Sequence, residues 1–182
     1  IFLKASPDAG SFFQGWSGPC STTNPLCVVP LSTTSTVTAT FATAASFSSV
    51  IVDIDAKLNS SLNKISVNLP AGTFKLFVIG PGQGGAYTAW NAWGNVTGCP
   101  DLPDGSGCNT GWLTYYSFSS SLGEQTVESN GRFETPGQAL AAVSSGTIIT
   151  LPTAQTVQFW NPDCCPGDNV SGVSVLIVDA ST

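Results

Sequence analysis

Alternating apolar and polar residues recur along most of the chain and predict an all-β protein. The runs with this period of two lie at residues 35–41, 65–69, 74–79, 147–151, 156–160 and 173–178. Clusters of Gly, Pro and Asn separate them, and short strands bounded by such clusters are typical of a β-sandwich. One short helix is expected at residues 135–143, where Thr135 would cap the helix and Pro136 would occupy its first position.

A segment of small residues divides the chain into two parts. Residues 42–49 consist mainly of Ala, Ser and Thr, and we interpret them as a linker between residues 1–41 and residues 50–182. Phe47 is the large apolar residue in this segment. We therefore expect the junction to pack against the fold rather than to move freely.

Composition narrows the class of protein. The 182 residues include 5 Lys or Arg and 11 Asp or Glu, which gives a net charge of −6, and only 9% of residues are charged. Nucleic acids and anionic membranes bind basic surfaces, so neither is expected as a partner. No apolar stretch reaches the roughly 18 residues of a transmembrane helix, so membrane insertion is not expected. A neutral polar surface favours an extracellular adhesin, lectin or fibre subunit.

The cysteines indicate an oxidising compartment. The chain has 6 Cys but no His and no Met, and we expect a secreted protein. Closeness in the sequence favours the disulfides Cys20–Cys27 and Cys99–Cys108. Cys164 and Cys165 are then left over, and a vicinal disulfide between them is our preferred interpretation. Bridges to other partners, or two thiols in a loop, are the alternatives.

The first 41 residues contain a motif of their own. It includes the sequence Gly15-Trp-Ser-Gly18, the two cysteines that follow, and the alternating segment 37–41. This pattern resembles the small all-β InlB-type B-repeat of bacterial surface proteins, which implies a modular spacer rather than a catalyst. Such repeats have a further strand before the position of Ile1. Without that strand a sheet edge would stay open, and the rest of a longer chain or a neighbouring subunit would be expected to cover it.

The turn at residues 161–169 carries the strongest candidate chemistry. Asp163, Asp168 and Asn169 can direct three side-chain oxygens inward, and a sharp turn also exposes backbone carbonyls. Ca²⁺ requires six to eight oxygen ligands of these kinds. Softer metals prefer His and free Cys, which are absent or expected to be paired. The alternative is a turn that Asp and Asn stabilise without any ligand.

The turn and the strand after it resemble a known motif. Residues 160–177 are similar to the C-terminal motif of the calcium-dependent galactose-binding lectins of the PA-IL type. The similarity extends to the paired strands of residues 65–79, to the loop of residues 85–90 and to the disulfide loop of residues 99–113. It thus covers about residues 50–182. It implies a jelly-roll-like, galactose-binding-like β-sandwich that follows the small β repeat module.

The same resemblance implies a ligand set. Carried over by motif, the calcium ligands are Asp163, Asp168, Asn169 and the backbone carbonyls of Cys165 and Tyr87. Two hydroxyls of a galactose-like glycan would complete the coordination shell in place of water. The sugar-contacting His of these lectins has no counterpart, because this chain has no His. The resemblance therefore implies the ion more directly than the sugar.

Aromatic residues precede the turn and supply candidate sugar contacts. The residues expected at a sugar site are Tyr87, Trp90, Trp93, Asp168 and Asn169. Trp and Tyr faces stack on the apolar faces of sugars, and their polar atoms form hydrogen bonds. Core packing is the alternative role for each aromatic ring, and it is the role that we expect for Trp112.

Signals for catalysis are weak, and no enzymatic activity is expected. The absence of His excludes Ser–His and Cys–His nucleophiles. Several carboxylates could form a glycosidase-type pair. Their spacing singles out no pair, and we interpret them as solvated loop charges: Asp101, Asp104, Glu124, Glu128 and Glu134.

Two functional hypotheses follow. The first is a secreted or bacterial cell-surface protein that binds carbohydrate through Ca²⁺, as lectins and adhesins do. The second is a structural subunit of an extracellular filament or surface layer. Such a subunit would self-associate by strand complementation, with calcium in a structural role.

Overall fold

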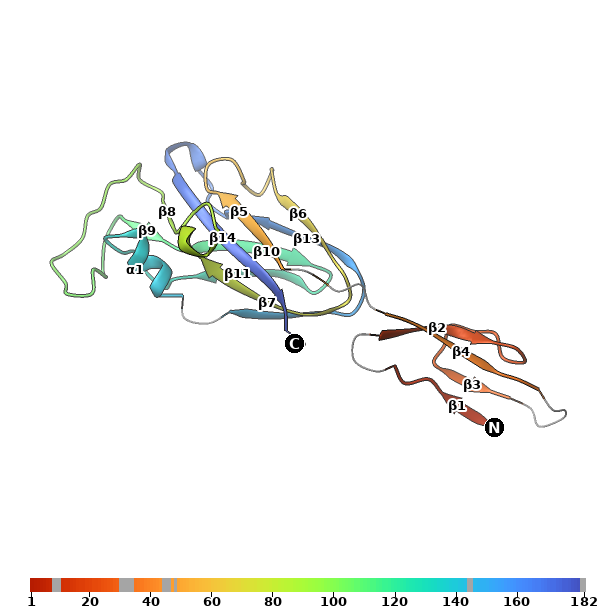
Figure 1. Ribbon diagram of the computed structural model, residues 1–182. Helices are drawn as coiled ribbons and strands as arrows, with labels where there is room; N and C mark the ends of the chain where they lie inside the picture. The colour runs from red at the N-terminus through yellow and green to blue at the C-terminus, as the bar shows by residue number, and fades with distance from the viewer. Residues whose placement is uncertain (8–10, 30–34, 44–46, 48, 144–145, 181–182) are drawn as a thin grey trace. The chain divides into compact units, whose positions relative to one another are not determined.

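The chain folds as two units, Ile1–Ser46 (unit 1) and Phe47–Thr182 (unit 2) (Figure 1). The computed structural model describes residues 1–7, 11–29, 35–43, 47, 49–143 and 146–180. The division falls inside the segment 42–49 that the sequence suggested as a linker. The first part of that segment belongs to a strand instead, because β4 extends to Thr43.

Unit 1 consists of two small antiparallel sheets. Its strands are β1 (Phe2–Lys4), β2 (Ser11–Ser17), β3 (Leu26–Val28) and β4 (Thr38–Thr43). Strand β1 pairs with β3, and β2 pairs with β4. The predicted disulfide Cys20–Cys27 is confirmed and ties the β2–β3 connection to β3. The core is small, and among the described residues of this unit the buried apolar side chains are Ala5, Cys27 and Val29.

One face of the β1–β3 pair exposes apolar side chains. Phe2 lies opposite Val28 in the register, and Lys4 lies opposite Leu26. Side chains on directly opposite residues point to the same face of a sheet. Phe2 is 85% exposed, and Leu26 and Val28 are also exposed, whereas Cys27 points to the other face and is buried.

Unit 2 contains the remaining strands and the single α-helix of the described residues. Its elements are β5 (Val50–Asp55), β6 (Ile65–Leu69), β7 (Gly72–Ile79), η1 (Pro81–Gln83), β8 (Trp90–Asn91), β9 (Trp112–Leu113), β10 (Tyr115–Ser120), β11 (Gly123–Glu128), α1 (Pro136–Ala141), β12 (Thr147–Leu151), β13 (Gln155–Trp160), η2 (Pro166–Asp168) and β14 (Val170–Asp179). One antiparallel sheet has the order β11-β10-β13-β6. The other has the order β12-β7-β14-β8-β9, and β5 also pairs with β14. Strand β14 is thus central, because it pairs with β5, β7 and β8 along its length.

The core of unit 2 draws side chains from both sheets. Its buried members include Ile54, Phe74, Leu76, Ile149, Val175 and Ile177 from the β5–β7–β12–β14 strands and Leu69, Tyr116, Phe118, Val157 and Phe159 from the other sheet. The rings of Phe118 and Phe159 stack with their centroids 5.8 Å apart. Phe47, the first residue of unit 2, packs on Phe74 with ring centroids 5.1 Å apart.

Most of the predicted elements are present, and several of them have shifted ends. The predicted helix begins at Pro136 with Thr135 as its N-cap, where the Thr135 hydroxyl accepts a hydrogen bond from the Gln138 amide. It ends at Ala141 rather than at residue 143. Strands β5, β8, β9, β10 and β11 of unit 2 were not predicted. In β10 the consecutive residues Tyr116, Ser117 and Phe118 are all buried, and this run hides the period of two.

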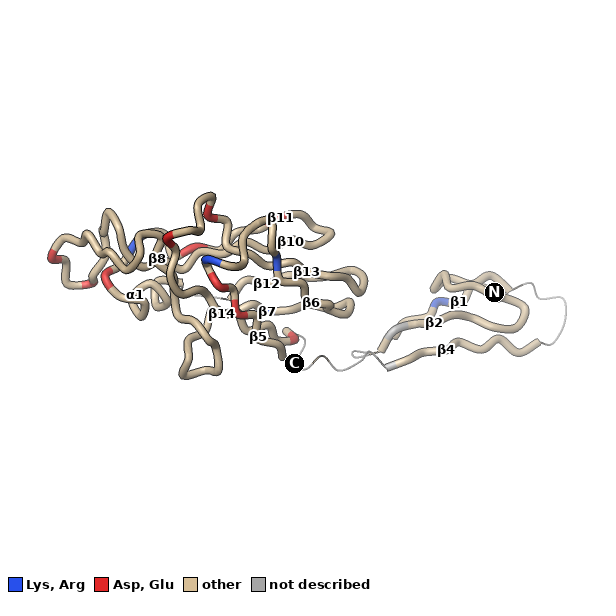
Figure 2. Tube along the Cα trace, turned by 90° about the horizontal axis from the view of Figure 1, so that it is seen from above, with Lys and Arg blue, Asp and Glu red and all other residues tan. Residues whose placement is uncertain are grey.

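Charged groups are sparse and lie mainly on unit 2 (Figure 2). Two carboxylates that the sequence analysis assigned to loops, Glu124 and Glu128, lie instead on β11, where both are exposed. No helix in the described part of the chain has the length and apolar character needed to cross a membrane.

Candidate functional site

The turn at residues 161–169 joins β13 to β14 and contains the short helix η2. The buried Asn161 holds its first part in place. The amide of Asn161 donates to the Asn59 carbonyl at 2.7 Å, and its side-chain Oδ1 accepts from the Asp163 amide at 2.8 Å. The turn is therefore attached to the β5–β6 connection, and the backbone that carries the Asp163 carboxylate is fixed.

Asn169 is buried inside the turn with one oxygen unpaired. Its side chain is only 2% exposed. The amide nitrogen Nδ2 donates to the Ala56 carbonyl at 3.0 Å and to Asp163 Oδ2 at 3.1 Å. The Oδ1 atom is also buried and accepts no hydrogen bond from any residue that the structure describes. A buried acceptor without a partner is costly, and a donor or a cation placed against this oxygen would remove that cost.

The hydrogen bonds of Asn169 fix which end of its amide is the oxygen. Oxygen and nitrogen of an Asn side chain are assigned from their partners. Rotating the amide by 180° would place Oδ1 against the Ala56 carbonyl and the Asp163 carboxylate, which are both acceptors. The unpaired atom is therefore the carbonyl oxygen, which is a ligand type that Ca²⁺ accepts.

The loop that carries Trp93 lies against the same turn. The Gly94 amide donates to the Asp168 carbonyl at 3.1 Å. The fully buried Asn91 shapes this loop, because its Oδ1 accepts from the Trp93 amide at 2.7 Å and its Nδ2 donates to the Val96 carbonyl at 3.1 Å. Trp93 itself is half-buried. The structure thus brings the predicted residues Trp93, Asp168 and Asn169 into one region.

Tyr87 forms hydrogen bonds with residues of strands β14 and β5. Its amide donates to Ser174 Oγ at 2.8 Å, and its hydroxyl donates to Asp55 Oδ2 at 3.0 Å. Burial and this hydrogen bond raise the pKa of Tyr87. Its ring lies against Gly172, where an added Cβ would come within 2.7 Å of the ring. The predicted ligand Tyr87 is therefore anchored through Asp55 and Ser174 rather than through Asp163.

Two carboxylates beside Tyr87 were not identified from the sequence. Asp53 Oδ1 accepts from the Ala86 amide at 2.9 Å and from Ser174 Oγ at 2.5 Å, and Asp55 binds Tyr87. Both lie on β5, where the order Val-Asp-Ile-Asp buries the two apolar residues and leaves both carboxylates on the opposite face. This alternation was a signal that sequence analysis could have used.

Trp90 does not fit the predicted sugar site. It is only 2% exposed. Its Nε1 donates to the Tyr115 carbonyl at 3.0 Å, and its ring stacks on that of Tyr115 with centroids 6.4 Å apart. The prediction of a sugar contact is wrong for Trp90, because both its polar atom and its ring face the interior. Trp112, which we expected in the core, is only half-buried.

The six cysteines differ in state. The predicted disulfide Cys99–Cys108 is confirmed. Cys164 and Cys165 are exposed thiols whose Sγ atoms lie 2.6 Å apart, so the vicinal disulfide that we preferred is not formed in this structure. The Cys164 thiol raises the pKa of Cys165, and the carboxylates of Asp163 and Asp168 add to that rise. The two disulfides of the chain indicate an oxidising compartment.

The donor set limits which cation would suit the turn. No three Asp, Glu, Cys or His side chains gather closely enough to hold a metal ion within the described ranges. A cation here would depend on amide and backbone carbonyl oxygens together with a carboxylate. Such ligands suit a hard ion of the Ca²⁺ type rather than a softer transition metal, and the unpaired Asn169 oxygen fits that requirement.

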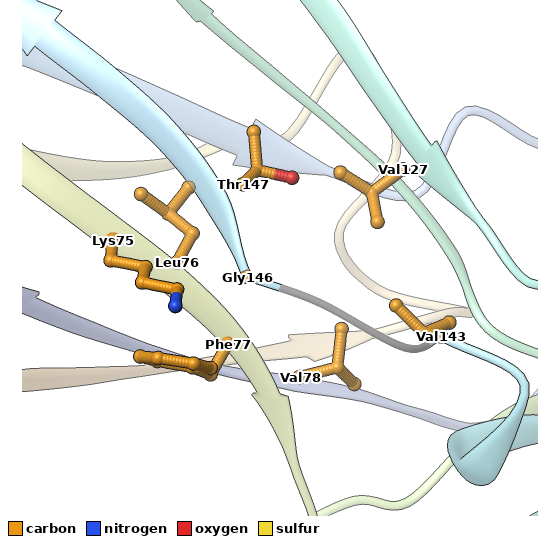
Figure 3. A pocket seen from close by; sticks show the side chains of 8 residues that line it. All are labelled: Lys75, Leu76, Phe77, Val78, Val127, Val143, Gly146 and Thr147. Atoms are coloured by element: carbon orange, nitrogen blue, oxygen red, sulfur yellow. The ribbon is translucent and has the colours of Figure 1, made fainter.

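A separate cavity of about 180 Å³ contains none of the predicted site residues (Figure 3). Its lining residues are Lys75, Leu76, Phe77, Val78, Val127, Val143, Gly146 and Thr147. This described lining is mostly apolar, includes one amine and lacks a carboxylate. It provides no acid–base pair or oxygen cluster for catalysis or cation binding.

Comparison with known proteins assigns no family. No family model, curated protein or solved structure matches the chain. The resemblances to PA-IL-type lectins and to B-repeats therefore stay predictions that rest on the quoted residues.

Proposed function

We propose that the 161–169 turn binds Ca²⁺ and that unit 2 is a calcium-dependent carbohydrate-binding module of a secreted, bacterial cell-surface protein. In this proposal unit 2 is a jelly-roll-like sandwich and unit 1 is a spacer. One observation carries the proposal: the buried Oδ1 of Asn169 has no hydrogen-bond partner within the described ranges and lies on a side chain that contacts Asp163.

The proposed ligands are chosen from the hydrogen bonds within the turn and from the lectin motif that the turn resembles. Asp163 and Asn169 are the central pair, because the Asn169 amide joins the two side chains. Asp168 and the carbonyls of Cys165 and Tyr87 complete the set that the lectin resemblance implies. A hard cation bound to Asn169 Oδ1 would satisfy the unpaired oxygen and would offset the negative charge of the carboxylates.

The proposed glycan contacts lie on the exposed side of the turn. Vicinal hydroxyls of a galactose-like sugar would replace water on the ion. Asp168 is exposed and available to bind sugar hydroxyls. The loop that carries Trp93 is hydrogen-bonded to the Asp168 carbonyl, so Trp93 belongs to the same region and is available to stack on the sugar. The guanidinium of Arg132 lies 4.7 Å from the centre of the Trp93 ring, so a sugar would stack on the ring face that Arg132 leaves open.

Thermal unfolding in EDTA and in a series of Ca²⁺ concentrations, with and without galactose, tests both steps. A ligand that binds only the folded state stabilises it by about 2.7 kcal/mol at a concentration of one hundred times its Kd. We expect a shift with Ca²⁺ and a further increment with galactose. Asp163→Asn should remove the calcium shift, and Asp168→Ala should abolish glycan binding while the fold stays intact.

Asp101→Asn is the matched control for these variants, because it removes one negative charge from an exposed loop outside the turn. It should keep the full calcium shift. The absence of any shift in the unmodified protein would refute the calcium site. A calcium shift without a sugar increment would leave a structural ion and refute the lectin activity.

The exposed apolar face of unit 1 favours the second candidate function, a filament or surface-layer subunit. Phe2, Leu26 and Val28 present this face on a short strand pair, and exposed apolar patches mark association surfaces. Self-association would cover it, and strand addition to an edge would provide main-chain hydrogen bonds.

Sedimentation at increasing protein concentration tests self-association. The unmodified protein should form oligomers, and Phe2→Ser with Val28→Ser should stay monomeric. Gln14→Ser, at an exposed polar position of β2, should associate like the unmodified protein. A monomer at every concentration, with and without Ca²⁺, would contradict the subunit hypothesis.

A further inference from the structure

Two adjacent thiols lie inside the proposed calcium turn. Cys164 and Cys165 are both exposed, and their sulfur atoms are 2.6 Å apart. The other four cysteines form disulfides, which indicates that the chain encounters oxidants. Exposed thiols that already touch each other need little movement to form a bond in such an environment.

The backbone of Cys165 connects these thiols to the proposed ligands. Its amide donates to Asp163 Oδ2 at 3.4 Å. Cys165 is also the residue before η2, which carries Asp168, and the Asn169 amide donates back to the Pro166 carbonyl at 3.3 Å. A change in the backbone torsions of Cys165 should therefore also move the Asp163 carboxylate, which precedes it, and the helix η2, which follows it.

We propose that Cys164 and Cys165 form a reversible dithiol–disulfide couple and that the state of this couple changes the calcium affinity of the turn. The couple itself depends only on the two thiols. Its effect on calcium rests on the proposed function. Closure of the ring restricts the torsions of Cys164 and Cys165, and the Asp163 carboxylate and η2 must then adjust to the new backbone.

The reaction requires a low-molecular-weight disulfide as oxidant, for which oxidised glutathione is the probe. Deprotonated Cys164 sulfur attacks one sulfur of oxidised glutathione, which forms a mixed disulfide and releases one glutathione thiolate. The Cys165 sulfur, after loss of its proton, attacks Cys164 Sγ and displaces the second glutathione thiolate. The two thiolates take up the two protons, so the protein loses two protons and two electrons while one glutathione disulfide is reduced to two thiols.

This couple should be easier to reduce than the other two disulfides. Strained or exposed disulfides have more oxidising potentials than buried structural ones. Cys164 and Cys165 are exposed, whereas Cys27 and Cys108 are buried. Rising concentrations of reductant should therefore open the Cys164–Cys165 ring at a concentration about tenfold lower than the other pairs require.

Thiol counting and intact mass after equilibration in glutathione buffers test the couple. The reduced protein should have two reactive thiols, and the oxidised protein should have none, with a mass lower by two hydrogens. Cys164→Ser with Cys165→Ser should show neither change, since the four other cysteines are already paired. Retention of both thiols under oxidising conditions, or disulfide-linked dimers in place of the ring, would overturn the proposal.

Calcium titration of the two redox forms tests the coupling. The apparent Kd should differ at least about fivefold between the forms, and the double serine variant should keep one Kd in both buffers. Equal Kd values in the two forms would overturn the coupling. If Ca²⁺ shifts the stability of neither form, the proposed calcium site fails and the coupling fails with it, while thiol count and mass still decide the couple independently.

Discussion

The two units of this chain differ in what holds them together. Unit 2 buries large apolar side chains between two sheets, with Phe118, Phe159 and Val175 all fully buried. Unit 1 has only small sheets and leaves Phe2, Leu26 and Val28 exposed on one face. Among the described residues of unit 1 the most buried is a disulfide cysteine, Cys27, which is 1% exposed.

This contrast shows how size determines the source of stability. Units of about forty residues bury too little surface to be stable without a staple, whereas units of more than one hundred residues can rely on a core. The same oxidising environment therefore has different consequences in the two units. In unit 1 the disulfide replaces a core, and in unit 2 it fastens a loop.

The largest expected effect comes from the core of unit 2. Phe159→Ala removes a buried ring that stacks on Phe118, and it should lower the free energy of unfolding of unit 2 by about 3–5 kcal/mol. Leu122→Ala, at an exposed turn position, should change it by less than about 0.5 kcal/mol. Denaturant unfolding followed by tryptophan fluorescence measures both. Similar losses in the two variants would contradict the assignment of the core.

The next effect separates the two units directly. Replacement of Cys20 and Cys27 by Ser should lower the stability of unit 1 by about 2–3 kcal/mol, as expected for a short closed loop. Because unit 1 has little core, we expect it to unfold. Hydrogen exchange of the backbone amides should then show loss of protection in β1–β4 while unit 2 stays protected.

The disulfide of unit 2 provides a matched comparison. Cys99–Cys108 spans a sequence separation of 9, close to the 7 of Cys20–Cys27. Serine at both of these positions should loosen the 99–108 loop and leave the sheets of unit 2 protected. If unit 1 stays folded without its disulfide, or if unit 2 unfolds without its own, the contrast between the units is refuted.

The smallest expected effect concerns buried hydrogen-bond donors that have no partner. Among the described side chains, each unit has one such donor. These are Trp16 Nε1 in unit 1 and the Tyr116 hydroxyl in unit 2. Tyr116→Phe removes the unpaired hydroxyl without a large change of volume and should stabilise unit 2 by about 1 kcal/mol. Urea unfolding at neutral pH measures the gain, and a loss of stability would show that the hydroxyl has a partner.

We also expect the stability of unit 2 to depend on pH through the buried Tyr116. Burial raises the pKa of Tyr116 above that of an exposed tyrosine, so the unfolded chain ionises first. The contribution of neutral Tyr116 to the free energy of unfolding is fully present below about pH 10, the pKa in the unfolded chain. It is lost at about 1.4 kcal/mol per pH unit as the pH rises from there toward the pKa in the folded state. Tyr116→Phe should reduce this alkaline slope. Tyr115→Phe, on the same strand, is the control that tests whether the slope belongs to Tyr116.

Sequence analysis identified several strands whose burial alternates, but it missed β5 and β11, which alternate as well. Strands β6, β12 and β13 lie where the period of two placed them, and α1 begins at its predicted cap. Strand β10 was missed because three consecutive residues in it are buried, which hides the alternation. The short strands β8 and β9 have two residues each, which is too few to show a period.

The candidate site was identified only in part. The turn chemistry drew attention to Asp163 and Asn169, which the structure joins by a hydrogen bond. Burial of Trp90 was not predicted, because a two-residue strand gives no pattern that distinguishes an interior ring from a surface ring. The roles of Asn161 and Asp55 depend on contacts between segments far apart in the sequence, and no local pattern records such contacts.

The side-chain amide of Asn169 offers the most direct test of the calcium site, because its oxygen is the unpaired atom. We would follow the Nδ2 proton resonances of Asn169 and the backbone amides of residues 161–169 by NMR during titration with Ca²⁺, with Mg²⁺ as the comparison ion. A calcium ion bound to Oδ1 should shift these resonances saturably, and Mg²⁺ should do so weakly because it demands a smaller octahedral shell. Resonances that stay unchanged at saturating Ca²⁺ would contradict the proposed site.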